Sequence, residues 1–277
     1  MLFNSLAFAI FFPLVTIIYF ALAHKHRWWW LLLASCIFYM FFIPVYIFIL
    51  VITILIDYWA GIKIEASTGA KRKNYLILSI ISTCLVLAVF KYFNFFNDNF
   101  RELANILGLH YSVPVMNIIL PIGLSFHTFQ SLSYVIEVYR GKYKAEKHFG
   151  IYSLYVMFYP QLVAGPIERP QNIIYQFYER HSFNYKAATS GLKLMAWGFF
   201  KKLVIADRIS PLVSQVFDHP ESHSGWSVIL ATLLFAEQIY CDFSGYSDIA
   251  IGSARVMGFK LERNFNLPYF SKSISEF

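Results

Sequence analysis

The chain has 277 residues, of which 58% are hydrophobic, 19% are aromatic and only 14% are charged, with a mean hydropathy of +0.53. Soluble domains have about 45–50% apolar and about 25% charged residues, so the composition excludes an ordinary soluble domain. It also excludes a disordered chain, which needs low hydrophobicity, and, with 13 Gly and 3 Cys, a collagen-like or disulfide-stapled one. The sequence predicts an integral membrane protein.

The net charge of +7 does not predict nucleic-acid binding. The basic residues lie in short loops between apolar runs, where they orient a chain in the bilayer. Cys36, Cys84 and Cys241 lie in or beside apolar runs without C-x-x-C or metal-ligand spacing, so we expect buried spectator thiols and no metal site.

The first apolar run, Met1 to Ala23, is long enough to span a bilayer. Ala21-Leu22-Ala23 resembles the cleavage site of a removable signal peptide. The run contains no Lys or Arg, however, and therefore lacks the cationic region that such a peptide needs. We expect an uncleaved first span.

The next run, Trp28 to Ile56, has 29 residues without Asp, Glu, Lys or Arg. As one helix it would be about 43 Å long, against a hydrocarbon core of about 30 Å. Pro44 instead predicts a hairpin of two shorter helices.

Five further runs follow: Asn74–Phe90, Ser112–Ile136, Ile151–Ile167, Ala187–Phe200 and Trp226–Tyr240. The last three contain prolines or charges, which are typical of helices packed inside a bundle rather than facing lipid. The predicted fold is a single all-α membrane domain over residues 1–277. It is a polytopic transmembrane helix bundle with short, broken and re-entrant helices around a tunnel.

The loop charges predict an orientation. The stretches His24–Arg27, Gly61–Lys73 and Glu137–Gly150 carry excess positive charge, whereas Lys91–Tyr111 is balanced. With Pro44 at an outer tip, all the positive loops fall on one side. The positive-inside rule then places the N-terminus outside and the loops near 25, 65 and 143 in the cytoplasm, in a multi-pass protein of the inner or plasma membrane.

The segment Leu120–Ser131 is the first of four polar clusters at membrane depth. Pro121 and Gly123 loosen the helix, and polar side chains from Ser125 to Ser131 can satisfy the freed backbone groups or line a wet path. His127 is either a neutral, hydrogen-bonded histidine inside the bundle or a residue that handles protons. Gln130 is a candidate for the same path.

The second cluster, Phe158–Pro170, holds three prolines and a glycine and predicts a broken or re-entrant segment. Its Glu168 and Arg169 are either an ordinary interfacial pair or an anchor for a loop at a cavity mouth.

The third cluster, Glu237–Asp248, is dense in polar groups. Asp242 caps a helix from about Gly245 to Gly258 and Asp248 is a partner of a neighbouring helix, or both belong to the polar wall of a substrate channel. In that helix Ala250, Ala254 and Gly258 form a small-residue stripe for close packing. The candidates for the wall are Gln238, Asp242, Ser244, Tyr246 and Asp248.

The fourth cluster is the end of the chain, Glu262–Phe277, in which Ser273–Phe277 reads as the opening of a helix. From this we expect a sequence truncated within a larger protein.

Read together, these segments resemble the membrane-bound O-acyltransferase (MBOAT) family, in its alginate O-acetyltransferase-like branch. The resemblance runs through the whole chain and is carried by five blocks: Leu120–Gln130, Tyr134–Gly141, Ala164–Arg169, Asp242–Gly252 and Asn264–Phe277. It implies an enzyme that moves an acyl group from a cytoplasmic donor, acetyl-CoA or another acyl thioester, toward a cell-surface polysaccharide such as alginate. It further implies help from periplasmic or extracellular polysaccharide-acetylation proteins, and no bound cofactor.

The family's essential histidine would act as the general base on the acceptor hydroxyl. In relatives the Ser-Ile-Ser/Thr-Glu-Phe stretch leads into a Trp-Arg-Arg-Trp-His segment, and the principal histidine follows in a Leu-Trp-His stretch. None of the 8 histidines here matches those positions, and His127 lies where an aromatic residue such as Tyr is expected. We therefore expect no catalytic residue in this chain and no activity from it alone.

Three other functions stay open at this stage. A D-alanyl transferase acting on teichoic acid is a near neighbour within the acyltransferases. A transporter would also need broken helices and intramembrane carboxylates, although no inverted repeat is visible. A non-catalytic membrane scaffold is the third.

Overall fold

The computed structural model describes residues 1–115, 123–163 and 165–276. Within them the chain is helical and contains no strand, which confirms the predicted all-α class. The α-helices are α1 (Leu6–Ala21), α2 (His24–Met40), α3 (Ile47–Ala66), α4 (Gly69–Ile106), α5 (Leu124–Tyr139), α6 (Phe149–Met157), α7 (Pro170–Ile173), α8 (Tyr185–Phe199), α9 (Asp207–Asp218) and α10 (Gly225–Val256). Short 3₁₀ turns η1 (Pro44–Tyr46), η2 (Ile174–Phe177), η4 (Pro220–Ser222) and η5 (Pro268–Phe270) and a π-helical segment η3 (Phe200–Ala206) complete the order.

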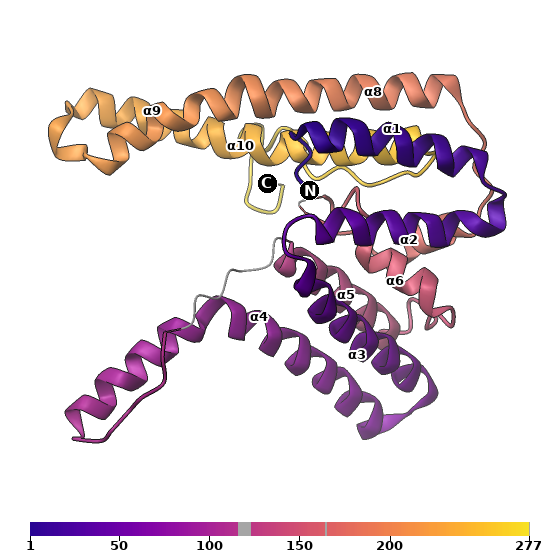
Figure 1. Cartoon of the computed structure of the whole chain (residues 1–277), viewed down its shortest axis with the longest axis horizontal. Coiled ribbons are helices and arrows are strands. Elements are labelled where there is room, and N and C mark those ends of the chain that lie inside the picture. The colour runs from indigo at the N-terminus through magenta and orange to yellow at the C-terminus, as the bar shows by residue number, and fades with distance from the viewer. Residues whose placement is uncertain (116–122, 164, 277) are drawn as a thin grey trace.

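Three groups of packed helices form the body of the molecule. α8 packs along α10, and α3, α4 and α5 pack on one another, while α2 packs on α6 (Figure 1). Among the described residues, three segments are long and apolar enough to cross a membrane: Pro44–Ala66, Gly69–Ile106 and Gly225–Val256. The apolar helix α1 is shorter, with 16 residues. The chain is a multi-pass membrane protein.

The predicted break at Pro44 is confirmed. α2 ends at Met40, and α3 begins after the 3₁₀ turn that Pro44 opens. A proline can start a helix but cannot donate an amide hydrogen bond within one, so the long uncharged run is divided where the ring stands.

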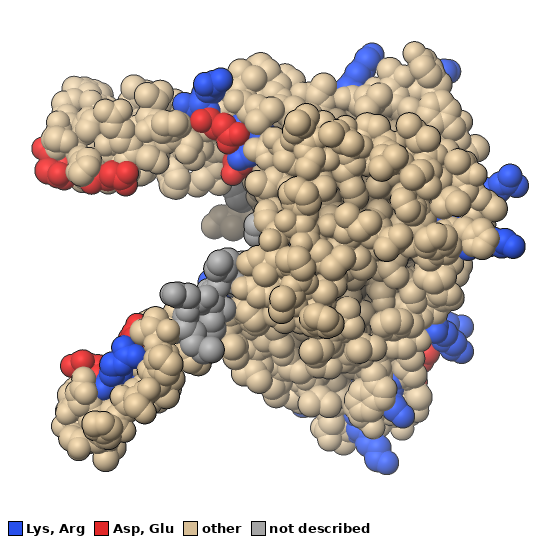
Figure 2. Space-filling view, in the orientation of Figure 1, with Lys and Arg blue, Asp and Glu red and all other residues tan. Residues whose placement is uncertain are grey.

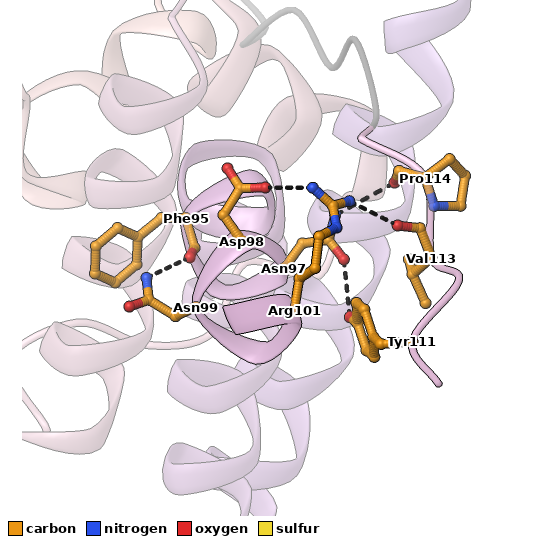
Figure 3. A network of polar contacts seen from close by, with 8 residues as sticks. All are labelled: Phe95, Asn97, Asp98, Asn99, Arg101, Tyr111, Val113 and Pro114. Carbon is orange, nitrogen blue, oxygen red and sulfur yellow. Dashed lines mark hydrogen bonds and ion pairs between the residues drawn. The ribbon is translucent and has the colours of Figure 1, made fainter. Parts of the chain in front are cut away.

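α4 differs from the expectation, because the stretch Lys91–Tyr111, predicted as a loop, is helical as far as Ile106. Figure 1 shows this end of α4 projecting from the body together with the chain that returns from it. Figure 3 shows how the returning chain is held: Arg101 bonds both Asp98 (3.2 Å) and the carbonyl of Val113 (2.9 Å). The hydroxyl of Tyr111 donates to Oδ1 of Asn97 over 2.8 Å.

Asp57 joins three helices through hydroxyl groups. Its carboxylate on α3 accepts a hydrogen bond from Ser79 (2.6 Å) and one from Thr83 (3.1 Å to Oδ1), both on α4, and one from Ser131 on α5. The hydroxyl of Tyr152 on α6 lies 2.9 Å from that of Ser131. A fully buried carboxylate is tolerated at membrane depth only with such partners, so this group fixes α3, α4 and α5 against one another.

The predicted interruption between Phe158 and Pro170 is also confirmed, since α6 ends at Met157 and irregular chain runs to α7. Gly123, directly before α5, packs against this segment. Its φ is +78°, and a Cβ there would lie 2.5 Å from the carbonyl oxygen of Leu162. A side chain at this position would therefore strain the backbone and collide with Leu162. Pro121 lies outside the described residues.

α10 corrects two expectations about the third cluster. It runs unbroken from Gly225 to Val256, so Asp242 lies in mid-helix and caps nothing. Gly258 follows the helix with φ +98° and is not part of a stripe, although Ala250 and Ala254 are fully buried. The segment Ser273–Phe277 does not open a helix in the described residues: Ser273–Glu276 forms a turn.

Two glycine pairs set the distance between α8 and α10. A Cβ on Gly252 would lie 2.6 Å from the carbonyl oxygen of Gly191, and a Cβ on Gly245 would lie 2.8 Å from that of Gly198. The two backbones thus touch at both places, as small residues permit in membrane proteins. The residues that carry this packing lie seven apart on each helix.

We predict that Gly252→Ala lowers the apparent melting temperature of the detergent-solubilised protein by about 2–6 °C, because the added methyl group forces the helices apart. Gly225→Ala is the matched control, since a Cβ there has nothing within 4 Å. Thermal unfolding followed by size-exclusion chromatography measures both. Equal melting temperatures for the two variants would contradict the close approach.

Candidate functional site

All four polar clusters of the sequence contribute to one cavity of about 440 Å³. Its lining consists of Ser125, Phe126 and Phe129 from α5, Ile167 from the broken segment, Phe243 from α10, and Asn264 and Phe265 from the chain beyond α10. The sequence analysis singled out each of these segments, but the candidate residues that it selected there are polar. The walls of the cavity are instead mainly aromatic.

The aromatic walls are fixed by ring contacts. Phe243 lies edge-on to both Phe126 (5.9 Å between ring centres) and Phe265 (5.0 Å). Asn264 is held by a hydrogen bond from its amide to the hydroxyl of Ser247 on α10, over 3.0 Å. Such a cavity suits an apolar group such as an acyl chain. Its polar lining residues, Ser125 and Asn264, are not proton acceptors at neutral pH.

Beside α10 lies a network of two lysines and three aspartates. Lys201, on the π-helical segment η3, makes an ion pair with Asp248 (2.8 Å) and donates to the hydroxyl of Ser244 (3.0 Å). Lys202 pairs with both Asp242 (2.6 Å) and Asp207 (2.9 Å). Figure 2 shows acidic and basic atoms side by side where the arm of α9 leaves the body.

The π-helical turn explains how two consecutive lysines reach the same helix. It widens the turn, so successive residues are separated by a smaller rotation than in an α-helix, and both ammonium groups reach α10. The charges are paired because an unpaired ion at membrane depth is costly. The aspartates singled out in the sequence are therefore brought together, but by two lysines that sequence reasoning missed.

A second set of predicted residues meets at the end of the broken segment. The backbone N–H of Glu168 donates to Oε1 of Gln130 over 2.8 Å, and Tyr155 donates its hydroxyl to the carbonyl of Glu168 over 2.8 Å. The carboxylate of Glu168 accepts from the backbone N–H of Glu262 over 2.5 Å. Burial raises the pKa of Glu168, which lies outside the three long spans, from 4.5 to about 7.

Glu168 and Arg169 do not form a pair with each other. Glu168 is fully buried, whereas Arg169 is exposed just before α7, and no ion pair joins them in the described structure. The role of Glu168 as an anchor for a loop at a cavity mouth stays a prediction. Ile167, its neighbour, lines the cavity.

The remaining candidates lie around these two groups. His127 is buried and its ring lies edge-on to that of Tyr39, with 6.5 Å between ring centres. Tyr246 lies beside the charge network, with the ammonium group of Lys202 5.6 Å from the centre of its ring. Gln238 is half-buried on α10. The predicted tunnel and the roles of all nine candidates stay predictions.

The prediction that all three cysteine thiols are buried is correct only for Cys241. Cys241 is buried, Cys36 is half-buried and Cys84 is exposed on α4.

Individual relatives match the chain, although no protein-family model does. A probable alginate O-acetylase, AlgI, of Pseudomonas aeruginosa is 36% identical over the whole chain, which covers 53% of that protein. A peptidoglycan O-acetyltransferase of Helicobacter pylori is 32% identical over 88% of the chain and 50% of its own length. A teichoic acid D-alanyltransferase of Bacillus subtilis is 27% identical over 59% of the chain and 42% of its own length.

The relatives that match along the whole chain are alginate O-acetylases, which are members of the membrane-bound O-acyltransferase family. Among the relatives described here, the alginate O-acetylases match the whole chain at the higher identity. The chain spans about half the length of the curated relatives that it matches.

We predict that Lys201→Met destabilises the folded protein by about 3 kcal/mol, because it leaves the carboxylate of Asp248 without its cation in a largely buried place. The double variant Lys201→Met/Asp248→Leu should recover much of this loss, since neither charge remains. Thermal unfolding in detergent compares the three proteins. A double variant less stable than Lys201→Met would contradict the pairing.

A pH-dependent prediction follows from Glu168. Its folded pKa is above its unfolded value, so its contribution to stability is complete below pH 4.5 and is lost as the pH rises toward 7. Relative to Glu168→Gln, the wild type should therefore gain melting temperature as the pH falls from 8 to 5. Parallel melting curves for the two proteins across this range would show that the carboxyl group does not titrate there.

Proposed function

We propose that the full-length protein is an O-acyltransferase that moves an acetyl group from a cytoplasmic acyl thioester, such as acetyl-CoA, to a cell-surface polysaccharide. Identity of 36% to an alginate O-acetylase along the entire chain carries this proposal and favours alginate as the acceptor. The peptidoglycan O-acetyltransferase relative supports the same class of reaction on another polysaccharide.

The aromatic cavity has a place in this proposal. An acetyl group that leaves a thioester at one membrane face needs a path that excludes water, because water would compete with the acceptor hydroxyl. The cavity lies among α5, α10 and the broken segment, and its apolar walls suit that path. We assign these residues the role of a wall rather than of a catalyst.

The general base is not assigned to any histidine of this chain. His127 lies beside Tyr39 and is not among the residues that line the aromatic cavity. Because the relatives are about twice as long as this chain, we infer that the base belongs to the part of the full-length protein that these residues do not include. No resident cofactor is needed for such a transfer.

The proposed orientation follows the loop charges. The N-terminus lies outside and the loops near residues 25, 65 and 143 face the cytoplasm, where the acyl donor is made. The acceptor then lies on the opposite side, where periplasmic or extracellular acetylation proteins receive the acetyl group.

We predict that membrane vesicles containing the full-length protein transfer radiolabelled acetyl groups from acetyl-CoA to a polyuronate, whereas vesicles containing residues 1–277 give only background. Expression of both proteins is matched by immunoblotting. Equal, robust transfer by the two would contradict the placement of the base.

Three further measurements separate the alternatives. Transfer of D-alanine but not acetyl would favour the teichoic acid reaction, for which the relatives match 59% and 56% of the chain. Solute flux through proteoliposomes without any acyl donor would favour a transporter. Co-purification with a polysaccharide-export complex without turnover would favour a scaffold.

A further inference from the structure

Three buried polar atoms have no hydrogen-bond partner in the described part of the chain although they lie close together. They are Nε2 of His127, Nε2 of Gln130 and Oε1 of Gln161. The side chains are buried, with 3%, 3% and 4% of their surfaces exposed. Buried polar atoms are nearly always bonded to protein or to ordered water, so three unpartnered atoms in one place call for a ligand.

All three residues line a second, smaller cavity. It has a volume of about 10 Å³, and Phe126, Leu162 and Ile167 are among its other lining residues. This volume is at the lower limit for one water molecule, which needs roughly 10–15 Å³ of such space and two to four polar partners. An organic ligand does not fit.

Other contacts fix which end of each amide faces the cavity. Oε1 of Gln130 is occupied by the backbone N–H of Glu168 at 2.8 Å, so its NH₂ group is left for the cavity. The NH₂ group of Gln161 is occupied by the carbonyl of Tyr155 at 2.7 Å, so its oxygen is left. The cavity therefore receives one donor, one acceptor and an imidazole nitrogen that can serve as either.

This set of groups matches water and no simple ion. A water molecule accepts from Gln130, donates to Gln161 and bonds His127 in either tautomer. A cation would meet the NH₂ group of Gln130, and an anion would meet the carbonyl oxygen of Gln161. We propose that His127, Gln130 and Gln161 hold one internal water molecule between α5 and the broken segment.

The water completes the attachment of the broken segment to α5. His127 and Gln130 belong to α5, and Gln161 belongs to the irregular chain that leads to Glu168. The small cavity and the aromatic cavity share Phe126 and Ile167 as walls. The bound water thereby positions one side of the aromatic cavity, and His127 acts as a water ligand rather than as a proton-transfer group.

Direct observation is the first test. In an electron cryo-microscopy map of the full-length protein at a resolution that shows ordered water, we expect one isolated peak at about 2.7–3.2 Å from all three atoms. An empty cavity, direct bonds among the three side chains, or a peak at metal-ligand distances would each overturn the proposal.

A double-variant comparison tests it without a map. His127→Phe and Gln161→Leu should each lower the melting temperature in detergent by about 2–6 °C, because each removes a ligand of the water and leaves the others unpartnered. Combined, they should cost little more than the larger single effect, since the water is already lost. Effects that simply add would overturn the proposal.

Thr16→Val supplies the matched control. The hydroxyl of Thr16 on α1 is also buried without a partner among the described residues, but Thr16 does not line the small cavity. Its effect should add to that of His127→Phe. If the control pair were as strongly coupled as the His127 and Gln161 pair, the coupling would reflect general unfolding and the water proposal would fail.

Discussion

The cost of burying polar groups away from water determines how this chain is held together. In a bilayer each such group must find its partner inside the protein. Asp57 finds hydroxyl groups on two neighbouring helices, Lys201 finds Asp248 and Ser244, and Glu168 finds the backbone of Glu262. Each of these contacts joins elements that are far apart in sequence. The apolar surface between them holds the helices in the membrane, whereas the polar contacts specify which helix faces which.

The sequence predicted the parts of the fold that depend on local chemistry. Pro44 and Pro160 coincide with breaks between helices, where a proline ring removes an amide donor. Pro13 and Pro211 lie within α1 and α9, so a proline alone does not decide where a helix ends. The helical end of α4 was missed because its charges suggest a solvated loop, although Arg101 is paired with Asp98 one helical turn away and with the returning chain. The alternative that Asp242 caps a helix was wrong for a similar reason, since its partner Lys202 lies 40 residues earlier and no local sequence pattern indicates the pairing.

In the candidate site, too, the sequence predicted the segments that take part but not the contacts between distant residues. The clusters around residues 125, 167, 243 and 264 do converge, which their polar content suggested, but the surfaces they present to the cavity are largely aromatic. The polar members bond one another behind these walls. The sequence analysis selected the acidic residues of these clusters. It overlooked the lysines of η3 and the serine and threonine partners of Asp57, because such common residues stand out only once the structure shows what they contact. Lys201–Lys202, next to an otherwise apolar run, was the available signal.

His127 illustrates how burial decides a chemical role. A histidine at membrane depth invites a proton-transfer interpretation, yet a general base must reach the acceptor hydroxyl or a water that connects to it. Nε2 of His127 faces a space for a single water, and the other polar groups there are amides, which neither take up nor release protons at neutral pH. Apart from His127 itself, the lining of this space contains no titratable side chain that could pass a proton on. The geometry therefore favours a structural role for His127, and the base for acyl transfer has to be sought elsewhere in the full-length protein.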